Sequence, residues 1–166
     1  MRAIHLENNG YLVANNNEVY NFGTGNFSMK AWVYSSTCGP VISRKSTAGG
    51  VGNGGFVWMI NRNGFIGLTN DDGTGYASVT SNPTNVLDGI WHHVAVVCEQ
   101  TSVVDGEQVA SDRKLGDKLP SLDVNNSMPL YIGSIDQEQQ PLRYFAGLMA
   151  EVRIWKGARE EKTIKA

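Results

Sequence analysis

Short apolar runs separated by turn residues constrain this chain more than any other feature of its sequence. Phe27–Tyr34, Phe56–Ile60 and Tyr76–Thr80 are such runs, and Phe27–Tyr34 shows partial alternation of apolar with polar residues. Alternation with a period of two is typical of half-buried β-strands, and 19 glycines in 166 residues supply many tight turns. The pattern predicts an all-β chain that folds as a two-sheet antiparallel β-sandwich or jelly roll.

The expected elements cover the chain without a visible boundary, so we expect one domain over residues 1–166. Hairpins are expected around Asn8-Asn9-Gly10 and around Asn61-Arg62-Asn63-Gly64, because asparagine and glycine tolerate the backbone of tight turns. One short C-terminal helix is expected over residues 158–164, and residues 112–127 are expected to be a long surface connection. The expected strands are 3–6, 11–14, 27–34, 41–43, 56–60, 65–68, 76–80, 90–98, 103–104, 108–109, 130–132 and 145–155.

The charge balance excludes several classes of partner. A net charge of −2 and a pI near 5.9 argue against nucleic-acid binding through a basic patch. No apolar run approaches the ~18–20 residues that a membrane span requires. The first residues do not resemble a signal peptide, because they include only one basic residue and no long apolar stretch.

Few side chains have a spacing that suits catalysis or transition-metal binding. Cys38 and Cys98 are not spaced as zinc ligands and are expected to be reduced thiols, with a single disulfide as the alternative. His92 and His93 are neighbours on a strand, so they point to opposite faces and cannot chelate one ion. The sequence has no paired carboxylates in a glycosidase pattern and no GxSxG or HExxH motif. We therefore expect that the chain is not an enzyme.

Five motifs occur in a fixed order along the chain. They are Asn26–Val33, Asp88–Val96, Val104–Ser111, Pro129–Gly133 and Phe145–Trp155. Through them the chain resembles a laminin G-like, pentraxin-like domain of the concanavalin A-like lectin/glucanase superfamily over essentially its whole length. The resemblance implies a concanavalin A-like jelly roll of two curved sheets, a fold often used to bind sugars and sometimes calcium.

The resemblance also implies roles for the tryptophans and the cysteines. Trp32, Trp91 and Trp155 lie in the framework strands of the family, so we expect them to pack in the core. Trp58 shares a strand face with core residues as well, although stacking on a sugar is an alternative. The disulfide of pentraxins would fall at Lys30 and Ala95, which supports free thiols here.

Strand direction predicts a candidate ligand site at one end of the sandwich. Strands of a meander alternate in direction, so loops 44–55 and 70–75 are expected at the same end. The resemblance implies that residues 130–133 run in the direction that places loop 134–144 beside them, at the rim where pentraxin-like relatives bind calcium and ligand. The expected ligand-binding residues are Asn70, Asp71, Asp72, Tyr76, Asp136, Gln137, Arg143 and Tyr144, and the expected calcium ligands are Asn53, Asp71, Asp72 and Asp136.

The chemistry of these side chains suits either of two functions or neither. Carboxylate and amide oxygens are the ligands that calcium prefers, and the same groups with tyrosine and arginine can hydrogen-bond and stack on a pyranose. The simplest alternative is that asparagine, aspartate and glycine merely form turns here.

The leading hypothesis is a non-catalytic carbohydrate-binding module or lectin that binds glycans or glycoproteins at these rim loops, with calcium as a candidate cofactor. The alternative is a laminin G-like protein-interaction or adhesion domain that binds no sugar. Weak single sites would require multivalency through a homo-oligomer or a larger chain. The family suggests an extracellular or cell-surface role.

Overall fold

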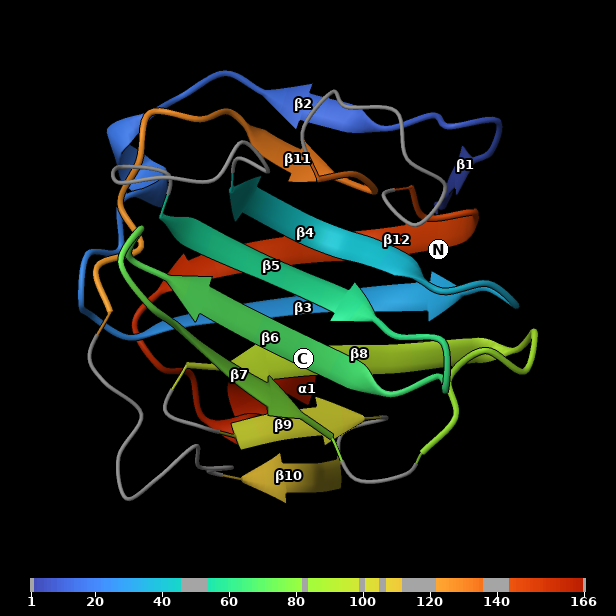
Figure 1. Cartoon of the computed structure of the whole chain (residues 1–166). Helices are drawn as coiled ribbons and strands as arrows, with labels where there is room; N and C mark the ends of the chain where they lie inside the picture. The colour runs from blue at the N-terminus through green and yellow to red at the C-terminus, as the bar shows by residue number, and fades with distance from the viewer. Residues whose placement is uncertain are drawn as a thin grey trace.

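The computed structural model describes residues 2–45, 54–81, 84–98, 101–104, 107–111, 122–135 and 144–165. In these residues two antiparallel sheets of six strands each pack face to face, as expected from the alternating pattern (Figure 1). Sheet A has the order β1 (Ile4–Leu6), β12 (Gly147–Lys156), β3 (Phe27–Tyr34), β8 (Trp91–Val97), β9 (Thr101–Val104), β10 (Glu107–Ser111). Sheet B has the order β2 (Leu12–Ala14), β11 (Leu130–Ile132), β4 (Gly39–Lys45), β5 (Gly55–Ile60), β6 (Ile66–Asp71), β7 (Tyr76–Thr80).

The core lies between the two sheets and is built from alternate residues of the central strands. Phe27, Met29, Ala31 and Val33 project inward from β3, and the facing strands of sheet B contribute the fully buried Phe56, Trp58 and Ile60. The expected hairpin around residues 61–64 is present as the paired strands β5 and β6, and β9 pairs with β10. β8 is a central strand flanked by β3 and β9. No helix in the described residues is long and apolar enough to cross a membrane.

The turn at Asn8-Asn9-Gly10 forms, but the hairpin expected around it does not. Asn8 and Asn9 adopt the left-handed backbone, with φ of 52° and 64°, and the Gly10 N–H donates to the Glu7 carbonyl over 2.8 Å. However, β1 pairs with β12 in sheet A, whereas β2 pairs with β11 in sheet B. The turn therefore carries the chain from one sheet to the other.

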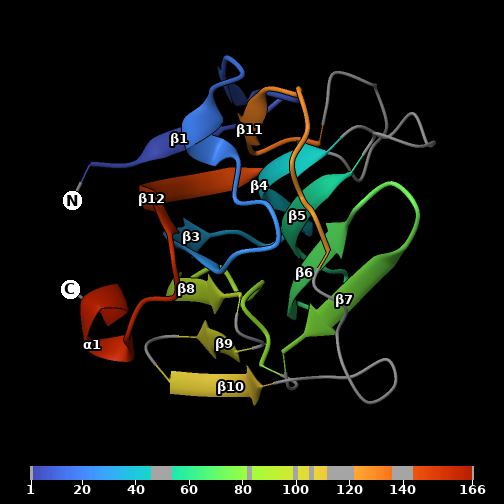
Figure 2. The ribbon, with the colours of Figure 1, turned by 90° about the vertical axis from the view of Figure 1, so that its left-hand side faces the viewer.

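The outer face of sheet A differs from the expectation for the tryptophans. Only Trp58 is in the core; Trp32, Trp91 and Trp155 are partly exposed and lie on strand positions that face away from it. The short helix α1 (Glu161–Lys165) packs on the same outer face and buries Ile164 against Ala95 and Val97 (Figure 2). The inward positions of β3 are already occupied by Met29, Ala31 and Val33, which is why its tryptophan faces outward.

The described residues confirm two smaller expectations. Both cysteines are free thiols. His92 and His93 point to opposite faces of β8, since His92 binds the Asp88 carboxylate at 2.9 Å while the His93 ring contacts Trp32. Lys30 and Ala95, where the resemblance places the pentraxin disulfide, are cross-strand partners. The described part of the expected 112–127 connection is not all surface, because Val124 is 1% exposed.

Candidate functional site

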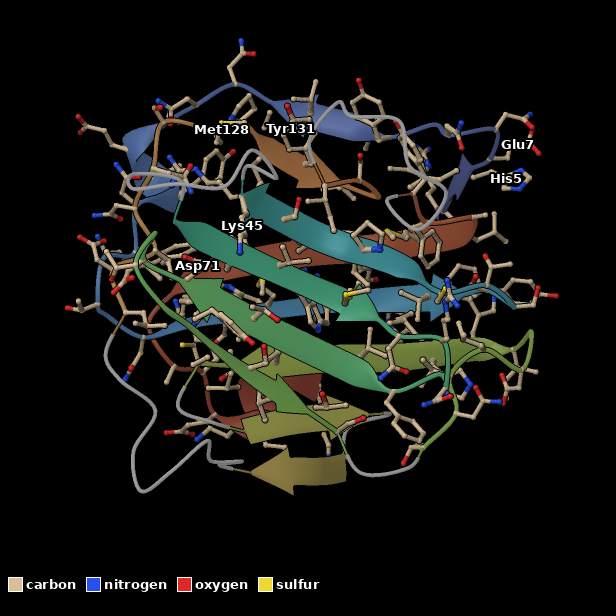
Figure 3. All side chains as sticks on the ribbon, in the orientation of Figure 1. His5, Glu7, Lys45, Asp71, Met128 and Tyr131 are labelled. Carbon is tan, nitrogen blue, oxygen red and sulfur yellow. The ribbon has the colours of Figure 1, made fainter. Side chains whose placement is uncertain are left out.

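An ion pair crosses three strands on the outer face of sheet B. Lys45 ends β4 and Asp71 ends β6, and the register places Gly55 of β5 between them. The lysine extends across β5 at Gly55, and its Nζ donates to Asp71 Oδ2 over 2.5 Å. The side chains of Lys45 and Asp71 are 23% and 18% exposed, so the pair is largely withdrawn from water. Figure 3 shows the two side chains together at one end of the sheet.

The turn after β6 holds the neighbouring acid. Asp72 Oδ1 accepts hydrogen bonds from the Thr74 N–H at 2.8 Å, the Thr74 hydroxyl at 2.7 Å and the Gly75 N–H at 2.9 Å. The bonds from Thr74 and then Gly75 lower the pKa of the Asp72 carboxyl below its ordinary value. This carboxylate therefore stays ionised and fixes the hairpin between β6 and β7.

The same face offers an exposed ring and hydroxyl groups. Tyr76 is the cross-strand partner of Asp71 and is 67% exposed. Two residues further from the turn on each strand, Thr69 and Ser78 are cross-strand partners, and their hydroxyl oxygens lie 2.8 Å apart. We call Lys45, Asp71, Asp72 and Tyr76 the Asp71 rim.

Towards β11 the same face of sheet B is closed. Ser43 is fully buried and donates to the Ser134 carbonyl over 2.7 Å. Tyr131, its cross-strand partner, is 2% exposed and contacts the Tyr11 ring at 5.9 Å between centroids. On this face the row through Ser43 and Tyr131 is therefore closed, while Tyr76 of β7 is open to solvent.

A buried arginine supports the base of the Asp71 rim. Arg44 is fully buried next to Lys45, and its guanidinium donates five hydrogen bonds, to three main-chain carbonyls and two side-chain amides. Burial lowers the pKa of this guanidinium. Asn126 adds a clamp, since its Nδ2 donates to the carbonyls of Arg44 and Gly54, both at 2.8 Å. These hydrogen bonds thus fix the end of β4 and the start of β5.

The structure brings together only some of the residues that the sequence analysis expects at the ligand site. Asp71, Asp72 and Tyr76 do meet at one end of sheet B, but Asn70 points inward, where its Nδ2 lies 3.4 Å from Cys98 Sγ. Asn70 Oδ1 is buried with no hydrogen-bond partner in the described part of the chain. Asn53, Asp136, Gln137 and Arg143 lie outside the described residues.

The expected position of loop 134–144 is wrong. β11 runs antiparallel to β4, so the residues that follow β11 start from the opposite end of the sheet from Lys45 and Asp71. Tyr144 confirms this, because its carbonyl lies against Gly39 at the start of β4. Gly39 and Lys45 are six steps apart along β4, which corresponds to about 20 Å. Tyr144 instead joins Tyr11, with ring centroids 6.2 Å apart.

Lys45 is the functional candidate that the sequence analysis missed. Its position on the strand could have indicated it. Lys45 lies two residues after Ser43, so both side chains are on the same face, and it lies at the end of the sheet already assigned to Asp71. What could not be seen was its partner, because the contact depends on a register in which glycine occupies the middle strand.

The described acids do not fit a calcium site. Asp71 Oδ2 is paired with the Lys45 ammonium, and Asp71 Oδ1 accepts the Gly73 N–H at 2.6 Å. Asp72 Oδ1 already accepts three donors from its own turn. Within the described ranges, no group of three or more His, Cys, Asp or Glu is arranged to hold a metal ion.

The fold and the motifs define the class of this protein. A laminin G family model, described as the concanavalin A-like lectin/glucanases superfamily, matches residues 6–165. The chain belongs to this family. A comparison with curated proteins gave no significant match.

Many solved structures share the fold, and three of them illustrate the similarity to this chain. The binding domain of Paraclostridial Mosquitocidal Protein 1 is 14% identical with a TM-score of 0.71, and the match covers 98% of this chain and 41% of that one. Domains LG4-5 of the mouse laminin α1 chain are 14% identical with a TM-score of 0.70, covering 96% and 43%. The Ruminococcus gnavus IT-sialidase CBM40 bound to α2,3 sialyllactose is 12% identical with a TM-score of 0.67, covering 93% and 94%. The chain thus spans about two fifths of the first two structures, and at these identities the likeness concerns the fold alone.

Proposed function

We propose that this domain is a non-catalytic glycan-binding module and that the Asp71 rim is its binding surface. The observation that carries the proposal is the exposed Tyr76 ring beside the Lys45–Asp71 pair on an open strand face. An aromatic face can stack on the C–H groups of a pyranose, while adjacent donors and acceptors bind its hydroxyls. Family membership and the fold shared with a sialidase carbohydrate-binding module support this choice.

The pair has unused hydrogen-bonding capacity for such a ligand. An ammonium carries three N–H donors, and a carboxylate has about four lone-pair positions. Within the described residues, Lys45 uses one donor on Asp71, and Asp71 accepts one further bond, from Gly73. Donor and acceptor therefore lie side by side, as neighbouring hydroxyls on a sugar require.

A glycan array tests the proposal. We expect binding by the unaltered chain and loss of at least about tenfold in affinity for Tyr76→Ala, which removes the stacking surface. Tyr34→Ala is the matched control, because Tyr34 is also exposed, at 39%, but lies on the outer face of sheet A. Equal losses in both variants, or no glycan bound at all, would refute the assignment to the Asp71 rim.

A second candidate function rests on the outer face of sheet A. Tyr34 and Trp91 are cross-strand partners with ring centroids 5.8 Å apart, and the flanking Ile90 is 57% exposed. Exposed aromatic and aliphatic groups of this kind are typical of protein-interaction surfaces. The adhesion alternative therefore predicts that Trp91→Ala abolishes capture of a protein ligand while Tyr76→Ala does not.

A further inference from the structure

The geometry points to Lys45 as the cation of the Asp71 rim: we propose that this surface binds an uncharged sugar without calcium. The inference rests on the proposed function, and it extends that function to the class of ligand and the role of the metal.

Lys45 places a positive charge beside the oxygen that a metal ion would bind. Its Nζ lies 2.5 Å from Asp71 Oδ2. A calcium ion bound to that same oxygen would lie about 2.3–2.6 Å from it, and therefore no more than about 5 Å from the ammonium. Like charges at that distance repel strongly in a partly dehydrated site, and the exposures of 23% and 18% show that this pair is partly dehydrated.

The local backbone keeps the lysine in this place. Lys45 and Asp71 are both cross-strand partners of Gly55, and a side chain at Gly55 would collide with the Arg44 carbonyl. Hydrogen bonds between Arg44 and Asn126, and from Asn126 to the Gly54 carbonyl, fix the end of β4 that carries Lys45 and the start of β5 at Gly55. The ammonium is therefore held in place by the strand register and not by a flexible loop.

The charges of the described rim select against an anionic sugar. Lys45 neutralises Asp71, and Asp72 adds one further negative charge beside them. A carboxylated or sulfated sugar would meet an excess of negative charge, whereas an uncharged pyranose can donate to Asp71 and accept from Lys45.

Two measurements on the unaltered chain test the inference. The first is a calorimetric titration of the calcium-stripped chain with calcium, for which we expect no saturable heat at millimolar concentrations. The second is a glycan array run in calcium and in chelator, for which we expect the same uncharged glycans to bind in both buffers. Lys45→Gln should weaken that binding by about tenfold or more, since it removes a charged hydrogen bond. Lys162→Gln, the same change at a side chain that is 82% exposed, should not.

Each outcome has a distinct meaning. Saturable calcium binding that is lost in Asp71→Asn would overturn the inference, as would binding restricted to sialylated or sulfated glycans. A Lys45→Gln variant that keeps its fold and full affinity would overturn the role of Lys45. If no glycan binds in either buffer, the proposed function fails, and the calcium titration alone then decides whether Lys45 takes the place of a metal.

Discussion

Replacing the buried Arg44 should cost more stability than any other single charge removed from the described residues. Its five donors bind Met128 O at 3.1 Å, Tyr20 O at 3.0 Å, Asn126 O at 2.6 Å, and the side-chain oxygens of Asn21 and Asn16, both at 2.7 Å. These bonds join residues 16–21 and 126–128 to the end of β4. The arginine thus holds together three segments that are distant in sequence.

The magnitude follows from what Arg44→Met leaves behind. Three main-chain carbonyls of partly buried residues lose their donor, at about 1–3 kcal/mol each, which is about 3–9 kcal/mol together. Removing the guanidinium also returns its desolvation cost, which is several kcal/mol for a buried ion. The net loss should be about 3–5 kcal/mol in the free energy of unfolding, which for a domain of this size lowers Tm by about 6–20 °C.

Urea unfolding followed by tryptophan fluorescence measures this loss, because the buried Trp58 reports on the core. Arg44→Lys should be intermediate, with a loss of about 2–3 kcal/mol, because three ammonium donors cannot satisfy five acceptors. Arg153→Met is the control: its side chain is 48% exposed and pairs with Glu151 at 3.6 Å, so the loss should stay below about 1 kcal/mol. A loss below about 1 kcal/mol for Arg44→Met would refute the reasoning.

Two further predictions concern backbone geometry and a buried lysine. Gly55→Ala should lower the free energy of unfolding by about 3–5 kcal/mol, because φ is +137° and the added Cβ would collide with the Arg44 carbonyl. Gly75→Ala is the control, since nothing lies within 4 Å of its Cβ position, and it should change the free energy of unfolding by no more than about 0.5 kcal/mol. Equal effects of the two substitutions would contradict the assigned contacts. Lys30 is 1% exposed and donates to the Ile164 carbonyl at 3.0 Å, and burial, followed by repulsion from Arg153, lowers its pKa from 10.5. At pH values between the folded-state pKa of Lys30 and 10.5, the unfolded state therefore binds more protons than the folded state. The free energy of unfolding of the unaltered chain, relative to that of Lys30→Met, should then rise as pH increases through this window. If urea titrations give the same difference between the two chains at every pH, the lysine is not desolvated.

Part of the candidate site could be predicted from the sequence. Asp71, Asp72 and Tyr76 were placed correctly at one end of a sheet, because β5, β6 and β7 are consecutive strands joined by short turns. Tyr144 was misplaced because the direction of β11 was taken from the family resemblance. β11 follows a long connection, so alternation of strand direction along the chain could not correct that expectation. Asn70 was assigned to the rim from its loop-like composition, whereas its parity with Phe56 directs it inward.

The sequence by itself determined the strands, their alternating faces and the family framework, because a period of two and the turn residues are local properties of the chain. It did not determine which strands become neighbours. Asn8-Asn9-Gly10 forms a turn of the expected kind, yet the strands on either side enter different sheets. The outward position of Trp32 and the contact of Lys45 with Asp71 also depend on partners from other strands. Hydrophobic burial between the sheets selects among such pairings, and only the tertiary structure shows which one satisfies every strand at once.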